Sequence, residues 1–425
     1  VLAELRLPAL VRGSGAAREL RWVRVKLAMT GMRVNQRAEP APAEALLRVD
    51  VCLTLGSTFS VVDPLLAAVW QARALLEALD AGEPVRLAVA LAREVAERAL
   101  RKGEYDSAAH AMHGNAEFLA KESGSDLAQS QCTLTKARVA LASGHWEDGI
   151  SAAADVVHRL RARGASSDCE VATGELTRLL GLLWSARWRE ARALSVRLSE
   201  DAEQRGDRHI MIIASLGRAM ALQLPEGDVA GVEQALATAM AVWGSDGFDL
   251  PHWWAAYVRG ECDLYRGEPR AAIRRLEAIW PNLKATLVHM GMVEVLARDQ
   301  RGRALLQAWP GLTARDQRSA KSTIKSDINS LGKLGPFGVL CSERLRAGMV
   351  LVRDGAPAGA AAYARVADLL QAGGVHAWSL ACKRRAALLS GDQGTAAQTW
   401  EQLHNLGVTD VDRTTDRLAP GSGSG

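Results

Sequence analysis

Apolar residues recur every three or four positions through most of the chain. One clear run contains Leu176, Leu179, Leu180, Leu183 and Trp184. This i, i+3, i+4, i+7, i+8 spacing places all five side chains on one face of an α-helix. Alanine, leucine and arginine dominate the composition, and these residues favour helices over sheets. The pattern therefore predicts an all-α protein.

A short box interrupts the helical pattern at a regular interval. It reads small, any, aromatic, any, any, small, and its clearest copies are Gly103–Ala108, Gly144–Gly149 and Ala186–Ala191. The first positions of these copies lie 41 and 42 residues apart. More degenerate copies begin at similar intervals, at Gly227, Gly267, Gly311, Gly355 and Gly391. Gly311 matches by spacing only.

Each position of the box has a physical role. The first small residue lets one helix end and the chain turn tightly. The aromatic residue fills the wedge between two helices, so we expect Tyr105, Trp146 and Trp188 in the core. The last small residue lies one turn later, where the paired helix comes closest. A period of about 41 residues predicts a right-handed α-solenoid of tetratricopeptide-like helical hairpins.

The pattern also predicts individual elements and their limits. Asp63 and Pro64 read as the N-cap and first residue of a helix that ends near Ala81. The polar, Lys- and Ser-rich stretch Ala308–Gly338 predicts a loop or a poorly ordered helix end. Three further helices are expected over Ala16–Gly31, over Glu44–Leu55 with a turn at Gly56–Ser60, and over Val85–Lys102. The predicted regions are a basic helical region (1–84), the repeat array (85–420) and a flexible tail or linker (421–425).

Charge is distributed unevenly along the chain. The formal net charge is +4, yet residues 1–48 alone hold nine basic and four acidic residues. Such an end could contact an acidic partner surface or nucleic acid. A solvated helix face is the preferred interpretation, and we do not expect nucleic acid as a partner.

Cysteine usage and hydropathy indicate the compartment. The six cysteines form no CxxC pair, which is typical of reduced thiols in a cytoplasmic protein. The uncharged run Val51–Val62 is too short to cross a membrane, and the first residues do not form a secretory signal. Because the chain starts at Val1, we expect it to be cut from something longer.

No stretch carries a catalytic signature. The phosphate-binding loop, the dinucleotide fingerprint and the kinase motifs are all missing from the sequence. His110 and His113 share a helix face, but no carboxylate or cysteine partner accompanies them, so packing or surface roles are preferred over a metal site. We therefore expect no catalytic residue, no cofactor and no metal site in this chain.

Candidate partner-binding residues lie where the repeat pattern breaks. The stretch Gly247–Tyr257 gathers an unusual number of aromatic side chains. Within it Trp253 and Tyr257 share one helix face, while Trp254 points elsewhere. Core packing is preferred for these residues, with a peptide-binding patch on the concave surface as the alternative. The candidate residues for binding a protein or peptide partner are Phe248, His252, Trp253, Trp254, Tyr257, Lys321 and Lys325.

Packing motifs run in order along nearly the whole chain. They are Glu44–Cys52, Gln71–Pro84, Phe248–Trp253, Asp263–Gly267, and Gly407–Asp410 with Leu418–Gly421. Together these stretches resemble the C-terminal helical region of large bacterial serine/threonine protein kinases, although Leu53–Phe59 and the segment near Lys321–Ser326 depart from the family pattern. In that family a kinase domain precedes an AAA-type ATPase module and a tetratricopeptide-like tail.

The resemblance implies a non-catalytic regulatory and protein-interaction tail. Its partner would be another protein, a peptide, or the kinase and ATPase modules of its own chain. A stand-alone tetratricopeptide scaffold and the repeat region of an ATPase-type transcription regulator are the alternatives. The second of these normally ends in a helix-turn-helix, whereas the segment after Val411 is short and acidic.

Overall fold

The computed structural model describes residues 2–8, 13–30, 40–60, 63–102, 105–162, 168–243, 248–286 and 290–421. Within these ranges the chain forms twenty α-helices and one short 3-10 turn, with no strand. The prediction of an all-α fold is confirmed. None of the described helices is both long enough and apolar enough to span a bilayer.

The first ten helices span the N-terminal half of the chain. They are α1 (Ser14–Thr30), α2 (Ala43–Phe59), α3 (Pro64–Ala81), α4 (Pro84–Lys102), α5 (Ser107–Glu122), α6 (Asp126–Ala142), α7 (Trp146–Ala162), α8 (Asp168–Trp184), α9 (Trp188–Arg205) and α10 (Arg208–Glu226).

The remaining helices span the C-terminal half. They are α11 (Val229–Trp243), α12 (Leu250–Tyr265), α13 (Pro269–Thr286), α14 (Gly291–Ala308), α15 (Ala314–Leu331), α16 (Gly335–Asp354), α17 (Ala356–Ala372), α18 (His376–Ser390), α19 (Gln393–Asn405) and α20 (Val411–Leu418), with the 3-10 turn η1 (Trp309–Gly311) before α15.

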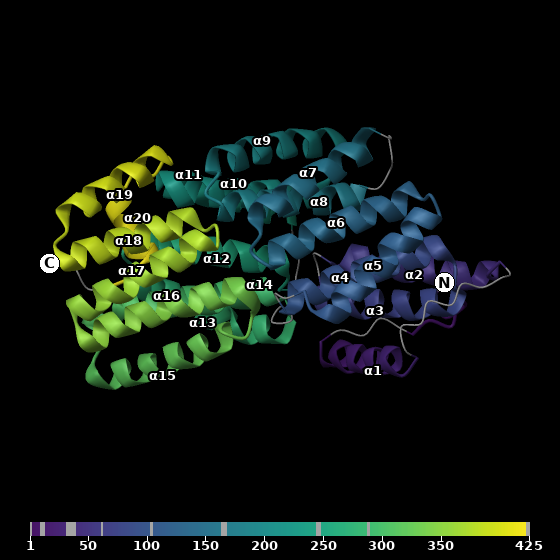
Figure 1. Cartoon of the computed structure of the whole chain (residues 1–425), viewed down its shortest axis with the longest axis horizontal. Coiled ribbons are helices and arrows are strands. Elements are labelled where there is room, and N and C mark those ends of the chain that lie inside the picture. The colour runs from purple at the N-terminus through teal and green to yellow at the C-terminus, as the bar shows by residue number, and fades with distance from the viewer. Residues whose placement is uncertain are drawn as a thin grey trace.

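The helices stack as hairpins in two layers (Figure 1). Helices α4, α6, α8, α10, α12, α14 and α16 form an inner layer, in which each contacts the next even-numbered helix. Odd-numbered helices from α5 onward pack outside them. Each hairpin buries its apolar face against its neighbours, as in a tetratricopeptide-like solenoid, and the largest buried cluster runs from Leu141 to Ala419 while a second one covers Ala16 to Cys132.

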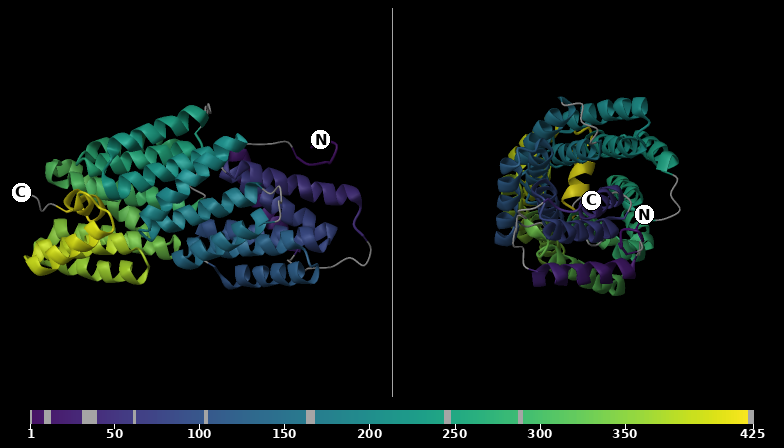
Figure 2. Two further views of the ribbon diagram at one scale, coloured as in Figure 1. Left: turned by 90° about the horizontal axis from the view of Figure 1, so that it is seen from above. Right: turned by 90° about the vertical axis from the view of Figure 1, so that its right-hand side faces the viewer.

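The superhelix closes on itself. Helix α14 contacts α4, although nine helices separate them along the chain. The indole Nε1 of Trp146 donates a hydrogen bond to the carbonyl oxygen of Gly373 across 3.0 Å, which joins the start of α7 to the end of α17. Figure 2 shows the result end-on, with α20 lying inside the ring of helices.

Two of the three box aromatics lie in the core as predicted, whereas Tyr105 is only half-buried. Trp146 and Trp188 are buried, with 3% and 5% of their surface exposed. A Cβ atom on Gly149 would lie 3.2 Å from the carbonyl oxygen of Ala137, so a small residue is needed where α7 crosses α6. Gly144 takes a positive φ of 80°, the left-handed conformation that ends a helix. Gly103 and Glu104 lie outside the described residues, and Tyr105 is half-buried.

One prediction of local structure is wrong, and another holds only in part. No turn forms at Gly56–Ser60, because α2 continues to Phe59. Gly56 allows this continuation, since its backbone lies against α3 and a Cβ there would be 3.4 Å from the backbone nitrogen of Gln71.

The stretch Ala308–Gly338 contains the expected segments outside the α-helices at 309–313 and 332–334, but most of it is the regular helix α15. The polar composition of α15 reflects a solvent-exposed outer face, while Ala320, Ile324, Ile328 and Leu331 are buried.

Candidate functional site

A cavity of about 440 Å³ opens on the inner face of the array. Its walls come from inner helices α4, α6, α8 and the start of α12, with the end of α2 on one side and residues around the start of α14 on the other. Cavities of this size hold small molecules or a few residues of a peptide. It is therefore the strongest candidate for a binding site.

Three helices line the cavity with stripes of the same kind. Helix α4 contributes Arg93, Glu97 and Leu100, which lie one turn apart along one face. Helix α6 contributes Gln131, Leu134, Arg138 and Leu141, and α8 contributes Cys169, Glu170, Thr173, Leu176, Thr177 and Leu180. The stripes together give the cavity a polar end, a charged middle and an apolar end.

Arg93 organises the polar end. Its Nη1 donates to the carbonyl oxygen of Leu53 across 3.0 Å and to Ser57 Oγ across 2.7 Å. Its Nε donates to Gln131 Oε1 across 3.2 Å, and its Nη2 donates to Glu170 Oε1 across 2.5 Å. Arg93 thus ties α2, α6 and α8 to α4, so its guanidinium holds the cavity wall in place.

The charged middle contains Glu97 and Arg138. Among the described residues, neither side chain forms a hydrogen bond or an ion pair within 4 Å. Burial raises the pKa of Glu97 to about 7, against the lowering effect of the Arg138 charge. Burial likewise lowers the pKa of Arg138, against the raising effect of Glu97. Two ionisable groups therefore face the cavity with hydrogen-bonding capacity that the described residues do not use.

The apolar end is built around Trp254. Leu180, Leu250, Met290, Met292 and Val293 line the wall beside it. Trp254 is only half-buried, and its ring packs edge-on against Tyr257 with ring centroids 5.9 Å apart. An indole with its N–H in such a setting can contact both apolar and polar parts of a ligand.

The structure separates the two adjacent tryptophans, in agreement with their helical spacing. Trp253 is fully buried and Tyr257 is 4% exposed, so both belong to the core. Trp254 lines the cavity instead. Phe248 is partly buried against the core and stacks on the ring of His252 at a centroid distance of 6.4 Å. His252 Nδ1 lies 2.5 Å from Asp249 Oδ1, in the cap of α12.

The candidate lysines lie apart from these aromatic residues. Lys321 and Lys325 are exposed on the outer face of α15, one turn apart. The cavity is lined by other helices, so the structure does not bring the lysines and Trp254 together. Of the predicted candidates, only Trp254 lines the cavity.

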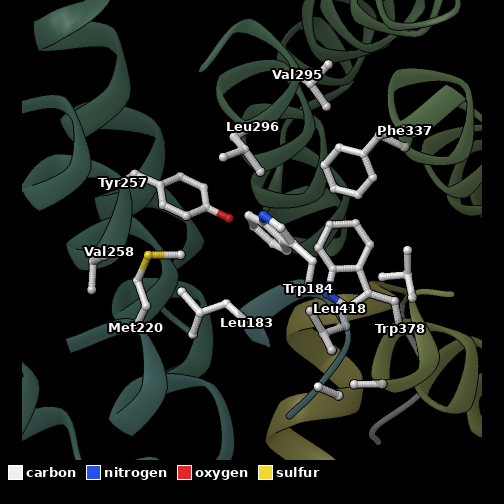
Figure 3. Packing of buried hydrophobic residues seen from close by; sticks show 14 of the residues in the cluster. Leu183, Trp184, Met220, Tyr257, Val258, Val295, Leu296, Phe337, Trp378 and Leu418 are labelled. Carbon is white, nitrogen blue, oxygen red and sulfur yellow. The ribbon is translucent and has the colours of Figure 1, made fainter. Parts of the chain in front are cut away.

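The C-terminal half of the inner space is filled. Trp184, Phe337 and Trp378 form a cluster in which Phe337 lies 5.5 Å from Trp184 and 5.6 Å from Trp378 between ring centroids. Figure 3 shows these rings together with Tyr257, Leu296 and Leu418, which come from α12, α14 and α20. These side chains fill the space that they surround.

The chain's own C-terminal segment occupies the same half. Arg303 Nη1 donates to the carbonyl oxygen of Arg417 across 3.0 Å, and Arg385 Nε donates to that of Ala419 across 2.8 Å. The hydroxyl of buried Tyr363 donates to the carbonyl oxygen of Pro420. Side chains of the inner face therefore bind the backbone of a polypeptide segment.

A buried charge network supports these contacts. Asp299 accepts from Arg303 Nε across 2.8 Å and from Arg344 Nη2 across 2.6 Å. Arg303 also pairs with Glu261, and all four side chains are almost completely buried. Burial opposes ionisation of Glu261 and Asp299, but the arginine charges and hydrogen bonds outweigh it and lower the pKa of both carboxyls.

The two histidines of α5 have different surroundings. His113 is buried, its Nδ1 lies 3.1 Å from the Tyr105 hydroxyl, and its Nε2 lies 3.3 Å from the carbonyl oxygen of Cys132. His110 is exposed. In the part of the chain that the structure describes, no three His, Cys, Asp or Glu side chains gather in a way that could hold a metal ion.

Sequence reasoning missed Glu97 and Arg138. A charged residue on the helix face that points toward the inside of the array could have indicated them, as Glu97 does between Arg93 and Leu100 on α4. Helical periodicity alone does not reveal that the stripe faces a cavity, because this depends on how closely the superhelix winds.

Comparison with known proteins shows the fold. No protein-family model matches the chain, and no curated protein matches its sequence. The crystal structure of a Rap protein complexed with competence and sporulation factor superposes with a TM-score of 0.61. The match covers 88% of this chain and 100% of that chain at 12% sequence identity. The chain is therefore similar in fold to a Rap protein, as a helical repeat array.

Proposed function

We propose that this chain is a non-catalytic protein-interaction array whose inner cavity binds a segment of polypeptide. The cavity carries this proposal, because half-buried Trp254 faces it together with Glu97 and Arg138, whose side chains have no partner among the described residues. An aromatic anchor beside unused polar groups is the usual composition of a binding pocket.

The chain's own C-terminal segment supports the same proposal. Arg303, Arg385 and Tyr363 already bind three backbone carbonyl oxygens of residues 417–420. Recognition through main-chain carbonyls does not depend on the sequence of the bound segment. The neighbouring part of the inner face, where the cavity lies, can hold another segment by related contacts.

The similarity to the Rap structure is consistent with such a role. That protein was solved in complex with competence and sporulation factor. For this chain we propose only that the array likewise binds another molecule.

The finer proposal follows the family resemblance. We propose that the array regulates a serine/threonine kinase and an ATPase module upstream in the same polypeptide, with the bound segment coming from a partner or from those modules. Occupation of the cavity would shift an active–inactive equilibrium by its difference in affinity for the two states. The coding sequence before Val1 tests the connection directly, since a free-standing scaffold would lack both modules.

The segment after Val411 is not a DNA-reading element. Helix α20 has eight residues and contacts α12, α14 and α18 within the array. Val411, Thr414, Thr415, Arg417 and Leu418 are buried there, so the segment does not present a recognition helix to DNA.

Peptide selection tests the binding proposal. We would incubate the full chain with a synthetic library of random hexapeptide amides and identify retained peptides by mass spectrometry. Trp254→Ala should weaken retention about tenfold or more at unchanged thermal stability, because aromatic anchors at interfaces are often worth ~2 kcal/mol.

Two matched tryptophan variants serve as controls. Trp400→Ala changes an indole that is 40% exposed on α19 and should leave retention unchanged. Trp253→Ala should lower stability by ~3–5 kcal/mol through loss of a core side chain. If the native chain retains no peptide from the library, or if Trp254→Ala and Trp400→Ala behave alike, the cavity is not the binding site.

A further inference from the structure

The charged side chains that line the cavity are Arg93, Glu97, Arg138, Glu170 and Asp207. Arg93 is paired with Glu170. The charges of Arg138 and of Arg24 on α1 act on Glu97, and that of Arg93 acts on Arg138. This leaves Arg138 as the cavity-lining arginine that has no carboxylate within 4 Å among the described residues.

Arg138 is half-buried at the cavity wall. Its guanidinium carries hydrogen-bond donors that no acceptor among the described residues takes up. A carboxylate is the group that best fits this planar fork, because the two can be joined by parallel charge-assisted hydrogen bonds.

Glu97 fits the same ligand in its protonated form. A neutral carboxyl group carries one O–H donor, which can be given to a second carboxylate. The groups that act on Glu97 are Glu94 from its own helix, Arg138 from α6 and Arg24 from α1. Burial keeps the pKa of Glu97 near 7, so the protonated form is abundant at neutral pH.

We propose that the cavity binds a peptide segment through one carboxylate, which Arg138 and the carboxyl group of Glu97 hold, with apolar side chains of the same segment against Trp254. This deepens the proposed function and rests on it. Leu134 and Leu141 flank Arg138 on α6, and Leu100 follows Glu97 on α4, so apolar surface surrounds the charged position. The carboxylate can be an Asp or Glu side chain or the free C-terminus of the segment.

The experiment uses two pools of random hexapeptides, one with free C-terminal carboxylates and one with C-terminal amides. The full chain is incubated with each pool, and retained peptides are sequenced by mass spectrometry. Enrichment of Asp and Glu beside apolar residues in both pools assigns the carboxylate to a side chain. Preferential retention of the free-acid pool without that enrichment assigns it to the C-terminus. Either result supports the proposal.

Variants identify the groups that hold the carboxylate. Arg138→Gln should reduce retention of the selected peptides about tenfold or more, as expected for loss of one charge-assisted contact. Arg138→Lys should recover part of it, because the charge remains but the fork is lost. Arg365→Met, which changes an exposed arginine on α17, is the matched control and should have no effect.

The pH dependence provides a second measurement. Retention should be stronger at pH 6 than at pH 8, because the carboxylate binds with a proton on Glu97. Glu97→Gln keeps a neutral donor at this position, so its retention should change little between the two pH values.

The two levels of the proposal fail in different ways. Retention that requires Trp254 but shows no preference for a carboxylate, or that survives Arg138→Gln in the folded chain, overturns the carboxylate site and leaves the proposed function standing. Selection of cationic peptides whose retention depends on Glu97 also overturns the carboxylate site and leaves the proposed function standing. Absence of any retained peptide from both pools overturns both.

Discussion

The indole nitrogen of Trp146 lies 3.0 Å from the carbonyl oxygen of Gly373, a residue 227 positions further along the chain. Trp146 is also the aromatic residue of the second box, so it fills the wedge between its own helices at the same time. Its ring packs edge-on against Phe337, with centroids 5.4 Å apart. One residue of the repeat pattern therefore closes the superhelix as well as building a single hairpin.

We expect Trp146→Phe to weaken this closure. The variant keeps an aromatic ring beside Phe337 but removes the N–H that donates to Gly373. It should lower the free energy of unfolding by about 1 kcal/mol, the net contribution of one hydrogen bond. Amide hydrogen exchange should become faster at the end of α17, near residues 369–375.

Trp188→Phe is the matched control for this prediction. Trp188 Nε1 donates to the carbonyl oxygen of Leu183 across 3.2 Å, a bond within its own turn. This variant should lose similar stability without faster exchange near Gly373. Equal exchange at α17 in both variants would show that Trp146 does not close the ring.

We expect the chain to lose stability in acid through Glu261 and Asp299. Both carboxyls have a lowered pKa in the folded state, because the charges of Arg303, Arg417 and Arg344 outweigh burial. Their contribution is fully present above the unfolded-state values of 4.5 and 3.8 and is lost as pH falls through the lower folded-state values. Urea midpoints should therefore fall between pH 5 and pH 3.

Glu261→Gln tests the origin of that loss. It leaves Arg303 without one buried partner and should cost about 3 kcal/mol at pH 6. Its urea midpoint should fall less steeply in acid. Asp155→Asn removes an exposed pair with Arg159 and should change stability by less than ~0.5 kcal/mol. The explanation is wrong if Glu261→Gln and the native chain lose stability equally between pH 5 and pH 3.

Glu97 should have the opposite effect on stability. Its pKa rises from 4.5 to about 7 on folding, so its contribution is fully present below 4.5 and is lost as pH increases through 7. The native chain should lose roughly 2 kcal/mol from this group between pH 5 and pH 8. Thermal unfolding of Glu97→Gln should lack this component, and an identical pH profile for the two proteins would contradict the assignment.

Backbone strain at the first position of the box can be tested by exchanging glycine and alanine in opposite directions at two copies. Gly144 has a φ of 80°, and a Cβ there would be no closer than 3.8 Å to its nearest neighbour, Trp146. Gly144→Ala should therefore cost about 1 kcal/mol through backbone strain alone. Ala186 occupies the same box position with a φ of 62°. Ala186→Gly should change stability far less, since relief of strain offsets the lost methyl group, and denaturant titration of both variants measures the difference.

Much of the fold could be predicted from the sequence because its determinants are local. Box spacing and helical stripes depend on residues within about one hairpin of each other, and Asp63 caps α3 as its position before Pro64 indicates. The departures of the structure from these predictions have one cause. Gly56 and the polar stretch before Gly338 resemble helix breakers, but packing against α3 in one case and an exposed outer face in the other permits a helix.

The site depended on information that the local pattern does not contain. The aromatic stretch correctly indicated that Trp253 and Trp254 point in different directions, since this follows from helical geometry. Which of them lines the cavity depends on the path of α12 relative to α4, α6 and α8. The partners of Glu97 and of the C-terminal segment come from elements far apart in the sequence, so neither could be deduced from spacing.

Closure of the superhelix also affects synthesis of the chain. At translation rates of 5–20 residues per second, the 227 residues between Trp146 and Gly373 take about 10–45 s to emerge. During that interval Trp146 and Trp184 lack the partners that later bury them, because Phe337 and Trp378 have not yet been made. The first half of the array therefore exposes these aromatic side chains while the second half is being synthesised. We expect its folding in cells to be assisted by chaperones.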